Sequence, residues 1–172
     1  MSKYNRYVRT INNFPKEGIS FKDINPIFED PIAFEVLIND LAQRTPSLTE
    51  YVIGIEARGF TLGAALAYRL GAGFIPIRKK GKLPPPTMSV TYDKEYGTDE
   101  LEISIPSEDK RGAFAIVVDD ILATGGTVLA AHQLASTYYT VRTVLFAGEI
   151  PSLGGGKELD KLNIPYTSLM KL

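Results

Sequence analysis

The chain of 172 residues contains no cysteine, no tryptophan and a single histidine, His132. Without cysteine it can form no disulfide bond, no Cys-based zinc site and no thiol nucleophile. One imidazole cannot supply the two or three that a His-based zinc site needs. His132 lies in a run that reads as helix interior, and the sequence has no G-x-S-x-G nucleophile motif. We therefore assign His132 a surface or packing role.

Long apolar runs and an excess of positive charge are also missing. No run approaches the ~20 apolar residues of a membrane-spanning helix, and the first seven residues show no apolar signal-peptide segment. The formal net charge is −1, whereas a general nucleic-acid-binding protein is usually basic. We expect a cytoplasmic protein that binds neither membranes nor nucleic acid, and the lack of cysteine is compatible with that location.

The apolar spacing predicts alternating strands and helices in one domain spanning residues 1–172. Helices are predicted over residues 2–12, 31–44, 59–70 and 126–136, and strands over 51–55, 73–77, 113–118, 141–147 and 166–169. Residues 14–26 read as a loop because Pro15, Gly18 and Pro26 interrupt them. The alternating segments 88–92 and 100–105 predict an antiparallel excursion. We expect an α/β fold with a central, mostly parallel sheet flanked by helices.

The most informative segment follows the predicted strand 113–118. It begins with Asp119 and Asp120 and continues into Ala123, Thr124, Gly125, Gly126 and Thr127. In open parallel sheets, ligands bind at the carboxyl ends of the strands. The glycines let the backbone approach a phosphate closely, and the N–H groups at a helix start favour an anion. The two aspartates repel phosphate, so they suit sugar hydroxyls or the neighbourhood of a divalent metal.

This loop has neither the Walker A lysine nor the G-x-G-x-x-G pattern. It closely resembles the phosphoribosyl pyrophosphate (PRPP) motif of type I phosphoribosyltransferases. Four further blocks stand in the order found in the adenine phosphoribosyltransferase family, and they are residues 14–24, 56–60, 78–84 and 95–97. The resemblance runs from about residue 13 to the C-terminus.

The resemblance implies a type I phosphoribosyltransferase fold with a flexible hood at about residues 83–101. It implies transfer of the 5-phosphoribosyl group from PRPP to adenine in purine salvage, giving AMP and pyrophosphate. Mg²⁺ is the implied cofactor, held mainly by PRPP without a dedicated protein site. A homodimer is also implied, with part of the basic segment near the neighbouring subunit's site.

The same resemblance assigns roles to individual residues. Asp119 and Asp120 face the ribose, and Ala123 to Thr127 hold the 5′-phosphate. The pyrophosphate falls to Arg58, Arg78, Lys79 and Lys82, since placed cations stabilise a charged leaving group and arginine suits bidentate phosphate contact. The purine falls to Ile19, Ser20, Phe21 and Lys22, with Phe21 as the stacking ring. Glu95 and Tyr96 are the implied catalytic residues, and a non-proline cis peptide is implied at Glu56–Ala57.

Alternatives remain at several of these positions. Phe21 also reads as a core residue, residues 78–82 as a solvated basic loop, and Glu95 as part of a solvated loop. Ser20 and Lys22 depart from the family's common residues. After the last long strand the family often has Leu-x-Gly-Arg, whereas this chain has Leu153-Gly154-Gly155-Gly156 and so lacks the arginine. A transferase for hypoxanthine, xanthine or guanine is therefore one rival, because a lysine can donate to a purine O6. A non-catalytic PRPP-sensing regulator is the other.

Overall fold

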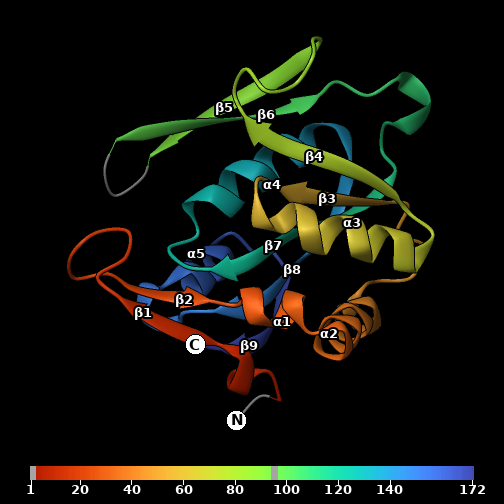
Figure 1. The fold of residues 1–172 in the computed structure, drawn as a ribbon. Helices are drawn as coiled ribbons and strands as arrows, with labels where there is room; N and C mark the ends of the chain where they lie inside the picture. The colour runs from red at the N-terminus through yellow and green to blue at the C-terminus, as the bar shows by residue number, and fades with distance from the viewer. Residues whose placement is uncertain (1–2, 94–96) are drawn as a thin grey trace.

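The computed structural model describes residues 3–93 and 97–172. Within these residues the chain forms a seven-stranded sheet with the order β5-β6-β4-β3-β7-β8-β9 and a separate hairpin, β1-β2 (Figure 1). The strands of the large sheet are β3 Tyr51–Ile55, β4 Gly73–Lys79, β5 Thr87–Asp93, β6 Thr98–Ser104, β7 Phe114–Leu122, β8 Thr140–Glu149 and β9 Tyr166–Lys171. The hairpin strands are β1 Arg9–Asn12 and β2 Ser20–Asp23.

Five neighbouring strands of the large sheet, from β4 through β3, β7 and β8 to β9, run parallel to one another. β6 alone runs the other way: it pairs antiparallel with β4 on one side and with β5 on the other, so β5 has the same direction as the five parallel strands. The prediction of a mostly parallel sheet with an antiparallel excursion is therefore confirmed. Because parallel strands end on the same edge, β3 and β7 deliver the residues that follow them to one place.

Helices cover both faces of the sheet (Figure 1). The helices are α1 Asn25–Glu29, α2 Pro31–Arg44, α3 Arg58–Leu70, α4 Gly126–Tyr138 and α5 Gly155–Lys161, with short 3-10 turns at Asn5–Tyr7, Glu108–Lys110 and Pro151–Leu153. On one face Leu134 of α4 joins a core cluster with Val117 of β7. On the other face Leu62 of α3 and Leu37 of α2 join Val118 of the same strand. Neighbouring residues of β7 thus point into opposite cores, as the two-residue period of a strand requires.

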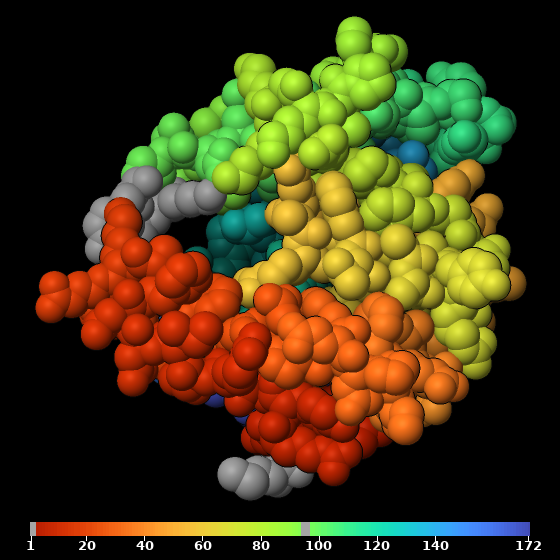
Figure 2. All heavy atoms as spheres, in the orientation of Figure 1, coloured from red at the N-terminus to blue at the C-terminus, as the bar shows by residue number. Residues whose placement is uncertain are grey.

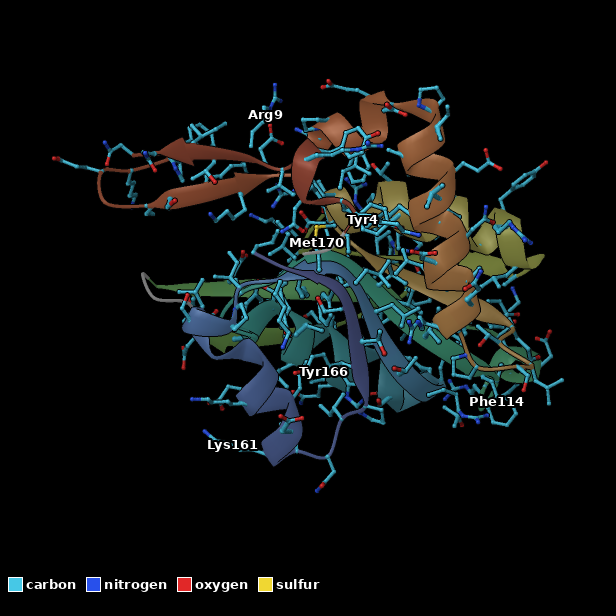
Figure 3. The ribbon with its side chains drawn as sticks, turned by 90° about the horizontal axis from the view of Figure 1, so that it is seen from below. Tyr4, Arg9, Phe114, Lys161, Tyr166 and Met170 are labelled. Carbon is cyan, nitrogen blue, oxygen red and sulfur yellow. The ribbon has the colours of Figure 1, made fainter. Side chains whose placement is uncertain are left out.

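Predicted positions 2–12 and 14–26 are the main errors of the sequence reading. In place of a helix followed by a loop, the structure has a short 3-10 turn and the antiparallel hairpin β1-β2. Figure 3 shows the hairpin extending beyond the rest of the molecule, with Arg9 near its base. Arg9 forms an ion pair with Asp23 on the facing strand, and its Nη2 atom lies 2.6 Å from Oδ2 of Asp23. Local apolar spacing cannot reveal this cross-strand partner, so the periodicity was read as helical.

None of the helices in the described ranges combines the length and apolarity that crossing a bilayer requires.

Candidate active site

A cavity of about 360 Å³ opens where β3 and β7 end. Residues 56–58 after β3 form one wall, and residues 119–125 form the other, with Thr127, Val128 and Phe146 completing the lining. Figure 2 shows the hollow between the red N-terminal segment and the green β5-β6 hairpin, with teal atoms on its floor. The cavity therefore joins two of the blocks that the sequence singled out, although they lie far apart in the chain.

The predicted boundary of the central strand was too early. β7 runs to Leu122, because it continues to pair with β8 beyond Val118: Asp119 faces Phe146 and Leu122 faces Glu149 in the register. Asp119 and Asp120 are consequently strand residues, held in fixed positions by the ladder. The turn that follows is only three residues long, at 123–125, and Gly125 adopts a φ of +95° before α4 begins at Gly126.

The two aspartates differ in their surroundings. Asp120 is buried, and its Oδ2 atom lies 2.7 Å from Nε of Arg58. Asp119 borders the cavity, and its Oδ1 atom accepts the N–H of Asp120 at 2.9 Å. Burial raises the pKa of Asp119 well above its ordinary value, and the adjacent charge of Asp120 raises it further. A hydrogen-bond donor or a cation beside this carboxyl group would stabilise its ionised form.

Arg58 links the carboxylates of the cavity to the hairpin. It begins α3, directly after a cis peptide at Glu56–Ala57, which confirms that prediction. Its guanidinium carbon lies 5.1 Å from the centroid of the Phe21 ring, while Nε pairs with Asp120. Arg58 was predicted to hold pyrophosphate. In this structure its charge is already paired with a carboxylate, so that role stays a prediction.

Gly59 makes this close approach possible. A Cβ atom on Gly59 would lie 2.8 Å from the carbonyl oxygen of Val118 and 2.9 Å from Oδ1 of Asp119. Contacts this short do not occur for real Cβ atoms, so any side chain here would push α3 away from β7. The glycine after Arg58 therefore sets the distance between the two walls of the cavity.

Apart from Arg58, the residues predicted to bind pyrophosphate contact one carboxylate, Glu56. Its oxygens accept from Nζ of Lys82 at 2.7 Å, from the Arg78 guanidinium at 3.3 Å and from the backbone N–H of Lys79 at 3.0 Å. Burial acts to raise the pKa of Glu56, but the hydrogen bonds from Lys82, Arg78 and Lys79 outweigh it and lower the pKa to about 2. Glu56 lines the cavity, so it brings the basic turn to the cavity wall.

A second carboxylate fixes the backbone of that turn. Glu102 on β6 is buried, and its Oε1 atom accepts the N–H groups of Lys82 and Leu83, each at 2.8 Å. Burial again acts to raise the pKa, and the backbone N–H donors of Leu83, Lys82 and Gly81 bring it below its ordinary value. The sequence reading passed over Glu102, although an acidic residue among the apolar positions of a predicted strand is an available signal.

The predicted purine residues lie on β2 and just before it, outside the cavity lining. Phe21 packs edge-to-face on Phe14, with ring centroids 5.2 Å apart. Lys22 points to the opposite side of the strand, and its Nζ atom lies 3.1 Å from Oγ1 of Thr10. Ile19 is 38% exposed, and Ser20 is exposed with Oγ 3.5 Å from Oδ1 of Asn12. The contact between Phe21 and Arg58 joins this group to the cavity wall.

The catalytic pair predicted in the hood, Glu95 and Tyr96, lies outside the described residues. On the strand before it, the hydroxyl of Tyr92 lies 3.2 Å from Oγ1 of Thr127. The β5-β6 hairpin therefore contacts the predicted phosphate loop directly. His132 is half-buried on α4, and burial lowers its pKa, which fits the packing role expected for it. In the part of the chain that the structure describes, no group of three or more metal-ligating side chains is found.

Comparison with known proteins matches this architecture. Residues 31–162 match the phosphoribosyl transferase domain family. The adenine phosphoribosyltransferase of Chlorobium luteolum is 46% identical over 156 residues, covering 88% of each chain. A crystal structure of the enzyme of the same name from Thermoanaerobacter pseudethanolicus superimposes with a TM-score of 0.91 at 43% identity, covering 99% of this chain and 98% of that one. The Saccharomyces cerevisiae enzyme, complexed with an imino-altritol bisphosphate and adenine, gives a TM-score of 0.86 at 40% identity, covering 97% and 96%. The chain belongs to the adenine phosphoribosyltransferase family and has the type I phosphoribosyltransferase fold.

Proposed function

We propose that this enzyme transfers the 5-phosphoribosyl group of PRPP to adenine, giving AMP and pyrophosphate in purine salvage. The observation that carries the proposal is the cavity where β3 and β7 end. It places a carboxylate pair beside a glycine-rich helix start. Relatives of similar sequence carry the name of that activity, and the yeast relative was crystallised with adenine. The proposal treats residues 1–172 as one domain, with a hood at about residues 83–101.

The proposed ribose phosphate site rests on complementary charge. The N–H groups at the start of α4 favour an anion, so the 5′-phosphate is assigned to the turn from Ala123 to Thr127. Asp119, whose raised pKa reflects burial next to Asp120, gains from hydrogen bonds donated by ribose hydroxyls. These two preferences point the sugar along β7, with its phosphate toward α4.

The proposed pyrophosphate site uses the other wall. Arg58, Arg78, Lys79 and Lys82 lie on it or beside it. Glu56 holds the side chains of Arg78 and Lys82 and the backbone N–H of Lys79, whereas the Lys79 ammonium pairs with Asp99. Fixed cations stabilise the negative charge that develops on the leaving pyrophosphate. Arg58 must exchange its contact with Asp120 for the anion, and the ribose hydroxyls then take its place at that carboxylate.

Mg²⁺ is part of the proposal as a companion of PRPP. This ion commonly uses one or two carboxylates together with substrate phosphates and water, and the cavity offers the carboxylates of Asp119 and Asp120 without a complete set of ligands. The residues thus fit an ion that arrives with PRPP. When bound, the ion would neutralise part of the pyrophosphate charge.

The purine is assigned to the hairpin. Phe21 is the stacking ring, and the backbone of residues 19–22 is assigned to the purine edge. The amine of Lys22 bonds to Thr10 on the other side of β2, so it is poorly placed to donate to a 6-oxo group beside Phe21. This contact favours adenine over the oxopurine rivals. Glu95 is assigned the proton transfer at the purine and Tyr96 a place beside it.

A spectrophotometric assay of the purified protein with PRPP and each purine tests the proposal. We expect AMP and pyrophosphate from adenine, with no turnover of hypoxanthine, xanthine or guanine. Turnover of an oxopurine without adenine would replace the proposed substrate. PRPP binding without release of pyrophosphate from any purine would support a regulator.

Assembly and location complete the proposal. The family resemblance favours a homodimer, with part of the basic segment near the neighbouring subunit's site. Light scattering coupled to size exclusion should give twice the chain mass of 18.9 kDa. We propose a cytoplasmic enzyme, which cell fractionation followed by the adenine assay would test.

A further inference from the structure

The contact between Tyr92 and Thr127 joins two parts of the molecule with different proposed tasks. Tyr92 lies near the end of β5, in the hairpin that forms the hood, whereas Thr127 is the second residue of α4 and lines the cavity. Tyr92 borders a separate hollow of about 560 Å³ between β5 and α4. Its hydroxyl therefore approaches Thr127 from behind, on the side away from the ligand cavity, at an oxygen–oxygen distance of 3.2 Å.

Packing around this contact fixes the distance between strand and helix. A Cβ atom on Gly126 would lie 3.3 Å from the carbonyl oxygen of Asp93 and 3.8 Å from Cδ2 of Tyr92. The end of β5 thus rests on the first turn of α4, so even a methyl group on Gly126 would require the strand to shift slightly. The Tyr92 hydroxyl is held where it can hydrogen-bond Thr127 without any movement of the backbone.

The direction of this hydrogen bond matters because each hydroxyl has a single proton. Either oxygen can be the donor in the absence of ligand. A fully ionised phosphate only accepts, so a phosphate in the cavity requires the Thr127 proton to point toward it. Thr127 Oγ1 then has only lone pairs to offer on its other side, where Tyr92 can donate. Hydrogen bonds in such a chain polarise and strengthen one another.

We propose that Tyr92 is a positioning residue for the phosphate-binding loop. Its hydroxyl donates to Oγ1 of Thr127 and thereby directs the Thr127 proton at the 5′-phosphate of the bound ribose phosphate. The inference rests on the proposed function, because it requires this loop to bind a ribose phosphate. It adds a residue of the hood to the phosphate site, and it makes occupancy of that site strengthen the contact between hood and loop.

Calorimetric titration with ribose 5-phosphate tests the inference, because this probe engages the loop without adenine or pyrophosphate. Tyr92→Phe removes one hydroxyl and keeps the ring packed on Gly126. We expect it to weaken ribose 5-phosphate binding roughly three- to tenfold, the range of one net hydrogen bond. In turnover assays the KM for PRPP should rise by a similar factor, while the KM for adenine stays unchanged.

A double-mutant cycle separates a specific contact from general damage to the hood. In a Thr127→Val background, Tyr92→Phe should have no further effect on the dissociation constant. In a Thr127→Ser background, which keeps the hydroxyl, it should cost the same factor as in the wild type. Tyr68→Phe is the matched control, because Tyr68 on α3 is 92% exposed and its hydroxyl is remote from the cavity lining.

Each outcome bears on a different conclusion. Equal affinity of Tyr92→Phe and wild type for ribose 5-phosphate would overturn the inference, and so would an equal loss in the Thr127→Val background. If the wild type bound neither ribose 5-phosphate nor AMP, the proposed function itself would fail, whatever the variants did. Thermal melting of each variant identifies a loss of affinity that comes from unfolding. If Thr127→Val unfolds, the comparison is made between Thr127→Ser and the Thr127→Ser, Tyr92→Phe double variant.

Discussion

The backbone N–H of Gly155 donates a 2.9 Å hydrogen bond to the carbonyl oxygen of Ala123. The first residue of α5 therefore supports the predicted phosphate loop, and the contact leaves no room for a side chain. A Cβ atom on Gly155 would press directly on the Ala123 carbonyl oxygen and lie 2.8 Å from Cδ1 of Leu122. The glycine-rich segment 154–156, which departs from the family's usual pattern, is thus part of the support of the active site.

Gly155→Ala should therefore displace the loop. We expect it to destabilise the protein by about 1 to 3 kcal/mol, as overpacking usually does, and to raise the KM for PRPP more than the KM for adenine. Gly154→Ala is the control: it strains a residue with a φ of +79° but meets no atom within 4 Å. The control should lose stability without a selective effect on PRPP. A PRPP KM that stays at the wild-type value in Gly155→Ala would show that the loop does not depend on this support.

Acid should weaken the protein through Glu56. Its pKa is about 2 in the folded state, below the ordinary 4.5, because donors from Lys82, Arg78 and Lys79 offset the effect of burial. The folded state then binds fewer protons than the unfolded state at intermediate pH, so stability rises with pH in that range. The contribution of Glu56 is complete above about pH 4.5 and is lost as the pH falls toward 2.

Urea unfolding at a series of pH values would measure this dependence. Glu56→Gln should unfold more readily than the wild type at neutral pH, and the difference should shrink steadily between about pH 4.5 and 2. Glu102 and Asp23, whose pKa values are also lowered, will leave part of the slope in place. A constant difference between the two proteins across the whole range would refute the role of Glu56.

Arg58→Gln should damage both stability and PRPP binding, because Arg58 is assigned to the pyrophosphate. It leaves the buried Asp120 carboxylate without its donor beside Asp119, and we expect this unsatisfied acceptor to cost about 1 to 3 kcal/mol. Arg9→Gln is the matched control, because it removes an arginine from the buried Asp23 on the hairpin. The control should lower the melting temperature and leave the affinity for PRPP intact. Equal affinities in the two variants would argue that Arg58 has a structural role only.

Phe21→Ala should raise the KM for adenine by roughly five- to a hundredfold, the range found for removal of one aromatic stacking partner. Ribose 5-phosphate binding should change little, since Phe21 does not line the cavity. Lys22→Met serves as control, because its amine bonds to Thr10 on the other side of the strand. A change of base preference in Lys22→Met would instead support the oxopurine rival.

Glu95→Ala should lower kcat by ~10²–10⁴-fold, the usual contribution of a proton-transfer group, with little change in PRPP affinity. Glu108→Ala, on an exposed 3-10 turn far along the chain, is the control for loss of one surface carboxylate and should keep the wild-type rate. An unchanged kcat in Glu95→Ala would remove that residue from the mechanism.

The central sheet could be predicted because its signal is local. Buried parallel strands such as Tyr51–Ile55 read as continuous apolar runs. The helix α4 begins within a glycine pair, at Gly126. The end of β7 was misplaced because Asp119 and Asp120 are polar, yet pairing with β8 keeps them extended. The N-terminal hairpin was missed because Arg9 and Asp23 find each other across the strands, and such partners leave no periodic trace.

The site shows the same division. Residues proposed to bind through their own backbone or charge, such as Gly125 and Arg58, stand in recognisable motifs. Residues that hold these motifs in place stand in no recognisable motif, because their role depends on a neighbour in space. Glu102 holds the turn at Lys82 from another strand, and Gly155 meets Ala123 from the far end of β8. Only the folded chain reveals that they belong to the site.

The pairing of β3 with β7 also has a kinetic consequence. It aligns Tyr51 with Ala115, residues separated by a long stretch of chain, and contacts of such large sequence separation slow folding because the loop must close before they form. The cavity has one wall after each of these strands, so it cannot exist until this closure is complete. Recovery of ribose 5-phosphate binding during refolding should consequently lag behind the recovery of helix content.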